Sequence, residues 1–172
     1  RAGLALGGAA AAATASLGLI VRSTAESAAQ IRQFAQVANA TPEALQRWSA
    51  GARTVGFEQE KLADILKDVN DRVGDFLQTG GGPMADFFES VAPRVGVTAD
   101  QFARLSGPEA LQLYVDTLER AGLSQQEMTF YLEAMASDAT RLLPLLRNGG
   151  AEMARLGDQA SDLGAVLDTD AI

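Results

Sequence analysis

Apolar side chains in this 172-residue chain recur at three- and four-residue steps, which is the spacing of one face of an α-helix. Residues 57–78 show this best, and their apolar positions are Leu62, Ile65, Leu66, Val69, Val73, Phe76 and Leu77. No segment alternates apolar and polar residues for long enough to predict a β-strand. Most of the apolar residues are alanine and leucine, which lose little entropy on entering a helix. The sequence therefore predicts an all-α fold.

Capping residues and prolines indicate where the helices begin. Thr41 can cap a helix whose first position is Pro42, since a proline there lacks only an N–H that would have no partner anyway. Residues 98–101 and 124–127 have the Ser/Thr-x-x-Glu/Gln pattern of a capping box. Pro144 lies within a run of leucines, and we expect it to kink or divide the helix there. These signals predict many short helices.

The glycine-rich joints predict three regions. Residues 41–148 are expected to form a compact bundle of short helices. Longer helical arms are expected on either side, over residues 1–40 and over residues 149–172, the second continuing beyond this chain. A flexible hinge is predicted at Gly80, Gly81, Gly82 and Pro83. A phosphate-binding loop is not predicted there, because no strand precedes the glycines and no Gly-Lys-Ser/Thr follows them.

Aromatic residues are the candidate anchors of the core or of an interface, because burying one removes a large area from water. They are Trp48, Phe57, Phe76, Phe87, Phe88, Tyr114, Phe130 and Tyr131. For Trp48, the single tryptophan, packing in a core or interface is favoured over stacking on a ligand. The helical segment that contains Phe87 and Phe88 is expected to insert both rings into the core.

Residues 2–21 contain no charged side chain and are bounded by Arg1 and Arg22. Their length could span a bilayer as a helix, although they are rich in alanine and glycine. Three interpretations remain open: a buried or self-associating helix packed through small residues, a conditional membrane-inserting segment, and a cleaved export signal. Because the chain begins without methionine, we expect an upstream portion to be missing.

Composition argues against several classes of function. The chain has 14 basic and 22 acidic residues, a net charge of -8, and no basic cluster, so specific binding to nucleic acid is not expected. It has no histidine and no cysteine, which excludes Ser–His–Asp and Cys–His catalysis and the usual zinc sites. We therefore predict no catalytic residue, no cofactor and no metal site.

Two acidic patterns have a functional alternative. Asp64, Asp68, Asp71 and Asp75 follow one face of the helix predicted over residues 57–78. That face could bind a cation or a partner, but a solvated surface is favoured because calcium loops place their ligands on a turn. Glu58 and Glu60 could act as a catalytic carboxylate pair. Residues two apart on a helix point to different faces, so this pair is disfavoured.

Several short phrases occur in this chain in a fixed order. They are LQRW at 45–48, VGF at 55–57, KLADILKDV at 61–69, MADFF at 84–88 after the glycine joint, LSGPEAL at 105–111, and ASD through LLPLL within 136–146. Together they resemble the tail tape measure proteins of long-tailed bacteriophages and related prophages. The resemblance covers about residues 23–172. It implies that the chain is an internal part, in the N-terminal half, of a much longer protein.

The resemblance also implies a function. Tape measure proteins lie in the lumen of the tail tube in a few copies, and their length sets how many tube rings are added. The implied partners are other copies of itself, the tail tube protein, tail assembly chaperones, tail tip or initiator proteins and, on infection, the host membrane. The implied locations are the virion, the bacterial host cytoplasm during assembly and the host envelope during genome delivery.

One further class of function remains open. An all-helical chain with an apolar segment at 2–21 could instead be a membrane-active module of a pore-forming or secreted effector protein. Release of dye from liposomes by this chain alone, without affinity for tail components, would favour that class. The structural ruler is the preferred prediction.

Overall fold

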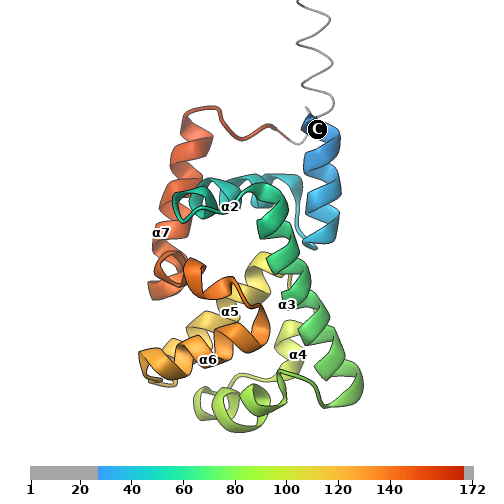
Figure 1. Ribbon diagram of the computed structural model, residues 1–172, viewed down its shortest axis with the longest axis vertical. Coiled ribbons are helices and arrows are strands. Elements are labelled where there is room, and N and C mark those ends of the chain that lie inside the picture. Colours follow the sequence, from blue (N-terminus) through green and yellow to red (C-terminus); the bar gives the residue numbers. More distant parts are fainter. Residues whose placement is uncertain (1–26, 169–172) are drawn as a thin grey trace, which may run out of the picture.

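The computed structural model describes residues 27–168, in which every regular element is a helix (Figure 1). A first helix occupies residues 27–37. It is followed by α2 (Pro42–Thr54), α3 (Gln59–Thr79), the π-helix η1 (Phe87–Val91), the 3-10 helix η2 (Ala92–Val95), α4 (Ala99–Phe102), α5 (Gly107–Arg120), α6 (Gln125–Met135), the 3-10 helix η3 (Ala139–Leu142) and α7 (Leu143–Asp162). The predicted all-α fold class is confirmed.

The helices cross one another around one apolar core (Figure 1). The first helix leads into α2, which lies along α7, while α5 packs against both α7 and α3. The short elements η1, η2 and α4 gather at the far end of α3 (Figure 1). Segments that are distant in the sequence thereby form a single packed body.

Small residues let α2 and α7 pack closely. A Cβ added at Gly51 would lie 2.4 Å from the Met153 sulfur, and one added at Gly157 would lie 3.1 Å from the Arg47 Cβ. Arg47 also forms an ion pair with Asp158. Within the region predicted as a C-terminal arm, 149–172, the helix α7 extends to Asp162 and packs along α2 instead of standing apart from the body. The segment 2–21, for which membrane insertion was one of three interpretations, lies outside the described residues.

The caps confirm the predicted helix starts. Thr41 caps α2 and accepts a 3.1 Å hydrogen bond from the Ala44 N–H. Ser124 caps α6 in a capping box with Glu127. The helical run around Pro144 is divided, as expected, because η3 ends at Leu142 and Pro144 lies in the first turn of α7, where a proline ring meets no clash. The helical path is broken a second time at residues 147–150.

The predicted apolar face of residues 57–78 is the buried face of α3, with one correction. Leu62, Leu66 and Val69 are fully buried, but Leu77 is 39% exposed because the helix ends just beyond it. Gly80 stops the helix in the left-handed conformation, with φ of 69°, which glycine adopts without steric cost. The predicted hinge is thus the joint between α3 and the cluster of short helices.

Candidate functional site

The predicted aromatic anchors form one main cluster at the end of α3. Phe87 from η1 lies 4.4 Å from Tyr114 of α5 and 5.0 Å from Phe88, measured between ring centroids. Phe76 of α3 stacks on Phe88 at 4.4 Å. Phe102 of α4, which was not among the predicted anchors, contacts both phenylalanines of η1. This cluster ties four helical elements together.

The two tyrosines connect the cluster to the surface by hydrogen bonds. Tyr114 is only 1% exposed, and its hydroxyl donates a hydrogen bond to the Tyr131 carbonyl oxygen at 2.7 Å. The Tyr131 hydroxyl in turn donates to the Asp86 carboxylate. Burial raises the pKa of Tyr131 to about 12, with the Asp86 hydrogen bond adding to the shift, and burial raises the pKa of Tyr114 further. Both phenols stay neutral at physiological pH and act as fixed donors.

The remaining anchors lie apart from that cluster. Phe57, 4% exposed, sits at the joint between α2 and α3 with the Arg141 guanidinium 4.5 Å from its ring centroid. Trp48 is half-buried on α2 and lines an apolar pocket beside Met153. Phe130 is 63% exposed on α6, edge-on to Tyr131. Phe130 is thus placed at the surface and the other two at helix junctions.

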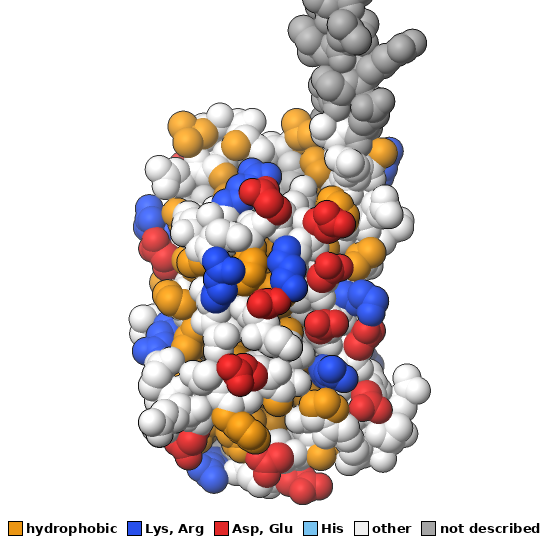
Figure 2. Space-filling view, viewed as in Figure 1, with side chains coloured by type: hydrophobic (Ala, Val, Ile, Leu, Met, Phe, Trp, Pro, Cys, Tyr) orange, Lys and Arg blue, Asp and Glu red, His pale blue; other side chains and the backbone are white. Residues whose placement is uncertain are grey.

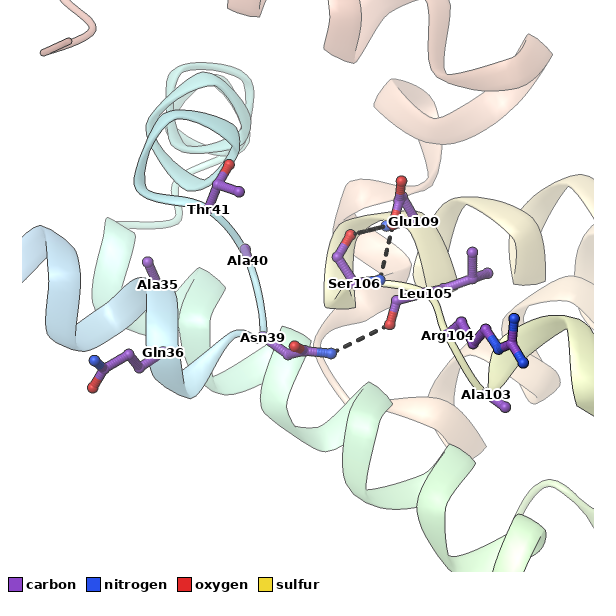
Figure 3. Close-up of a pocket in the computed structure, with 10 residues that line it drawn as sticks. All are labelled: Ala35, Gln36, Asn39, Ala40, Thr41, Ala103, Arg104, Leu105, Ser106 and Glu109. Atoms are coloured by element: carbon purple, nitrogen blue, oxygen red, sulfur yellow. Dashed lines mark hydrogen bonds between the residues drawn. The ribbon is translucent and has the colours of Figure 1, made fainter. Parts of the chain in front are cut away.

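A pocket of about 760 Å³ opens between the end of the first helix and the connection from α4 to α5 (Figure 3). Asn39, with φ of 49°, turns the chain on one wall, and its Nδ2 donates to the Leu105 carbonyl oxygen at 3.2 Å. On the other wall the Glu109 carboxylate accepts hydrogen bonds from the Ser106 N–H at 2.9 Å and its hydroxyl at 2.7 Å. These bonds to Ser106 lower the pKa of Glu109.

The polar groups of this pocket therefore hold the fold together. Glu109 and Ser106 form the capping box that starts α5, and Thr41 caps α2. Asn70 supports the same joint from α3 by donating to the Ala38 and Leu66 carbonyl oxygens at 3.1 and 2.9 Å. The pocket is a junction of three helix ends: α2 and α5 are capped by their own side chains, and Asn70 of α3 binds the end of the first helix.

The acidic residues of α3 are on the surface, as the favoured interpretation expected. Asp64, Asp68, Asp71 and Asp75 are all exposed, and Figure 2 shows acidic side chains interspersed with basic ones along the side where α3 runs. Lys67 forms an ion pair with Asp71 one turn away. Among residues 27–168 no group of three or more acidic side chains is placed to hold a metal ion.

The carboxylate pair considered above is also on the surface. Glu58 precedes α3 as its N-cap residue, is 82% exposed at its side chain and lies 3.6 Å from Arg53, while Glu60 is exposed in the first turn. The structure does not bring either carboxylate into a pocket with the other. Within the described part of the chain, no helix is both long enough and apolar enough to cross a membrane.

Comparison with known proteins gives no relative: no family model matches the chain, and no match was found among curated proteins or solved structures. Sequence reasoning did not single out several residues that hold the structure. Gln46 binds the main chain near the C-terminus, and Asn39 and Asn70 join three helices. Asn39 precedes a helix cap by two residues, a common place for a left-handed turn, but nothing in the sequence indicates its distant partners.

Proposed function

We propose that this chain is a structural part of a phage tail tape measure protein, which sets tail length during assembly and aids genome delivery through the host envelope. The observation that carries the proposal is where the family-like phrases lie. In LSGPEAL, Ser106 caps α5 and Gly107 meets the first helix. In VGF, Gly56 turns at φ of 84° so that Phe57 enters the core. Two of the phrases that resemble the family therefore lie at packed joints of this fold, while LQRW and KLADILKDV lie within α2 and α3.

The dimensions of the body bear on how it would serve as a ruler. Residues 27–168 as one continuous helix would span about 210 Å at about 1.5 Å per residue. Folded as a compact unit they span about 40 Å, from the usual scaling of radius of gyration with chain length. As a folded module the chain would add little to tail length per residue, and its surface would be free to contact tail partners.

The charge of the chain supports a place in the tail lumen. A protein that shares a conduit with DNA needs a surface that does not bind it, and a net charge of -8 disfavours contact with phosphates. The exposed Phe130 on α6 offers one apolar contact point. The proposed partners are other copies of the chain, the tube protein, the assembly chaperones and the tip or initiator proteins.

The proposal is tested by locating the chain in particles. A short epitope inserted into the full-length protein at residues 80–83, the exposed joint after α3, leaves the packed helices intact. In purified tails we expect an antibody against the epitope to bind only after the tube is opened by denaturant. An epitope on tube protein serves as the control for the outer surface. Absence of the chain from purified tails, or binding of the antibody to intact tails, would argue against a luminal tape measure.

A further inference from the structure

The last described residues form a strap that returns across the molecule. A turn with a left-handed Gly164, φ 69°, ends α7, and the Ala165 N–H donates back to the Ala160 carbonyl oxygen at 2.9 Å. Residues 163–168, called the strap below, then run from the end of α7 over to α2 and the first helix (Figure 1). The turn at Gly164 therefore directs the chain toward α2.

One side chain on α2 binds the main chain of the strap. The Gln46 Oε1 accepts a hydrogen bond from the Leu167 N–H at 2.9 Å, and its Nε2 donates to the Leu167 carbonyl oxygen at 3.2 Å. The amide thus pairs with both backbone groups of one residue, as a neighbouring β-strand does. Gln46 itself is only 9% exposed and is braced by a bond from Nε2 to the Pro42 carbonyl oxygen. This recognition requires an extended backbone and no particular side chain.

The strap buries little of its own surface. Leu163 is 77% exposed, and Gly164 and Ala165 are exposed too, whereas Leu167 is half-buried. Little apolar area of residues 163–165 therefore holds the strap down, and the two bonds from Gln46 tie its main chain to α2 at Leu167. A segment attached in this way is expected to open locally without unfolding the body.

A polar pocket lies beside the strap. It measures about 270 Å³, and the first helix, α2, the start of α3 and the strap itself form its walls. The Gln59 Nε2 on this pocket is buried and has no hydrogen-bond partner within residues 27–168. An unpaired buried donor is costly, and a carbonyl oxygen is the acceptor that would satisfy it. The Arg53 guanidinium, also on the pocket, offers further donors.

We propose that Gln46 and this pocket form a docking site for the main chain of an extended peptide segment, which the strap occupies in cis and vacates for a partner segment. The site binds the backbone of one residue through Gln46. The Gln59 Nε2 is left without a partner among residues 27–168 when the strap is in place, and a carbonyl oxygen of a partner segment would satisfy it. The proposal rests on these contacts and not on the tape measure role.

The first test measures amide hydrogen exchange by NMR in the 172-residue chain. Gln46→Met removes both bonds to Leu167, and we expect the Leu167 amide to exchange about tenfold faster, the effect of losing about two hydrogen bonds. Gln30→Met is the matched control, since Gln30 lines the same pocket from the first helix and is exposed. The Val69 amide in the core should be unchanged in both variants. Equal exchange of the Leu167 amide in the wild type and in Gln46→Met would overturn the proposal.

The second test separates backbone from side-chain recognition. Leu167→Ala keeps the N–H that Gln46 accepts, whereas Leu167→Pro removes it. The Gln46 side-chain amide signals should stay at their wild-type shifts in the first variant and move in the second. A blocked peptide of residues 163–168, added to the Leu167→Pro chain, should move them back. Release of the strap by Leu167→Ala, failure of the peptide to bind, or loss of Leu167 protection on dilution, which would mean that a second copy supplies the strap, would each overturn it.

Discussion

The close approach of α5 to the end of the first helix predicts a large effect from a single methyl group. A Cβ built at Gly107 would lie 2.1 Å from the Ala38 carbonyl oxygen and 3.2 Å from the Leu66 Cβ. A carbon and an oxygen normally approach no closer than about 3.3 Å, so Gly107→Ala must push α5 from the first helix by roughly 1 Å. That shift strains the bond from the Gly107 N–H to the Asn39 carbonyl oxygen, now 2.9 Å, and the Asn70 bond to Ala38.

The magnitude follows from these contacts. Overpacking of a well-packed joint costs about 1–3 kcal/mol, and two weakened hydrogen bonds add about 1–2 kcal/mol. Gly107→Ala should therefore lower the free energy of unfolding by about 2–5 kcal/mol. Gly74→Ala is the matched control: Gly74 lies within α3, and an added Cβ meets nothing within 4 Å. It should raise the free energy of unfolding by up to about 1 kcal/mol, because alanine is the better helix former.

The assay is urea unfolding of the 172-residue chain followed by circular dichroism at the helix band. If the free energy of unfolding depends equally steeply on urea in the three proteins, the urea midpoint should be highest for Gly74→Ala, intermediate for the wild type and lowest for Gly107→Ala. A midpoint for Gly107→Ala within error of the wild type would refute the packing of α5 against the first helix. A lower midpoint for Gly74→Ala than for the wild type would contradict the claim that an added Cβ at Gly74 meets no neighbouring atom.

Three further predictions concern titrating and aromatic groups. The bonds from Ser106 lower the pKa of Glu109 in the folded chain, so the stability that this carboxylate contributes is present above its ordinary pKa of 4.5 and is lost as pH falls through the folded value. In Ser106→Ala, acid titration followed by carboxyl NMR should show a higher Glu109 pKa, and the free energy of unfolding at neutral pH should fall by about 1 kcal/mol. Tyr131, with a pKa of about 12, and the more buried Tyr114 should give no phenolate absorbance near pH 10. The stability that they contribute is present below pH 10 and is lost as pH rises through their folded pKa values. Phenolate absorbance at pH 10 in the folded chain would contradict the burial of these two side chains. Phe87→Ala should cost about 3–5 kcal/mol and Phe130→Ser well under 1 kcal/mol in the same urea assay, because only the first ring is buried; equal losses would contradict the placement of Phe130.

Local signals carried most of the fold prediction. The periodicity of residues 57–78 and the caps at Thr41 and Ser124 each depend on neighbours within one helical turn, and the structure has helices there. At Pro144 the same local rules predicted a kinked or a divided helix without deciding between them, because the choice between a helix interior and a helix start depends on what precedes it. There η3 ends at Leu142 and α7 begins, so the ring lies in a first turn.

Contacts between distant residues could not be predicted from the sequence. Gln46 pairs with Leu167 across 121 positions, and no property of a glutamine indicates such a partner. Phe102 was expected to follow a capping box, but its place in the aromatic cluster depends on how η1 and α4 meet. Phe130 and Tyr131 are adjacent aromatic residues of similar size, yet Phe130 lies on the side of α6 that faces solvent and Tyr131 on the side that faces the core.

Tail length is the measurement that tests the tape measure role most directly. Residues 27–168 are deleted from the full-length protein in one variant and duplicated in tandem in another, and tails are measured by negative-stain electron microscopy. The account predicts shorter tails after deletion and longer tails after duplication, each by about 40 Å if the module stays folded and by up to about 210 Å if it is drawn out as a helix. Tails of wild-type length in both variants would contradict it.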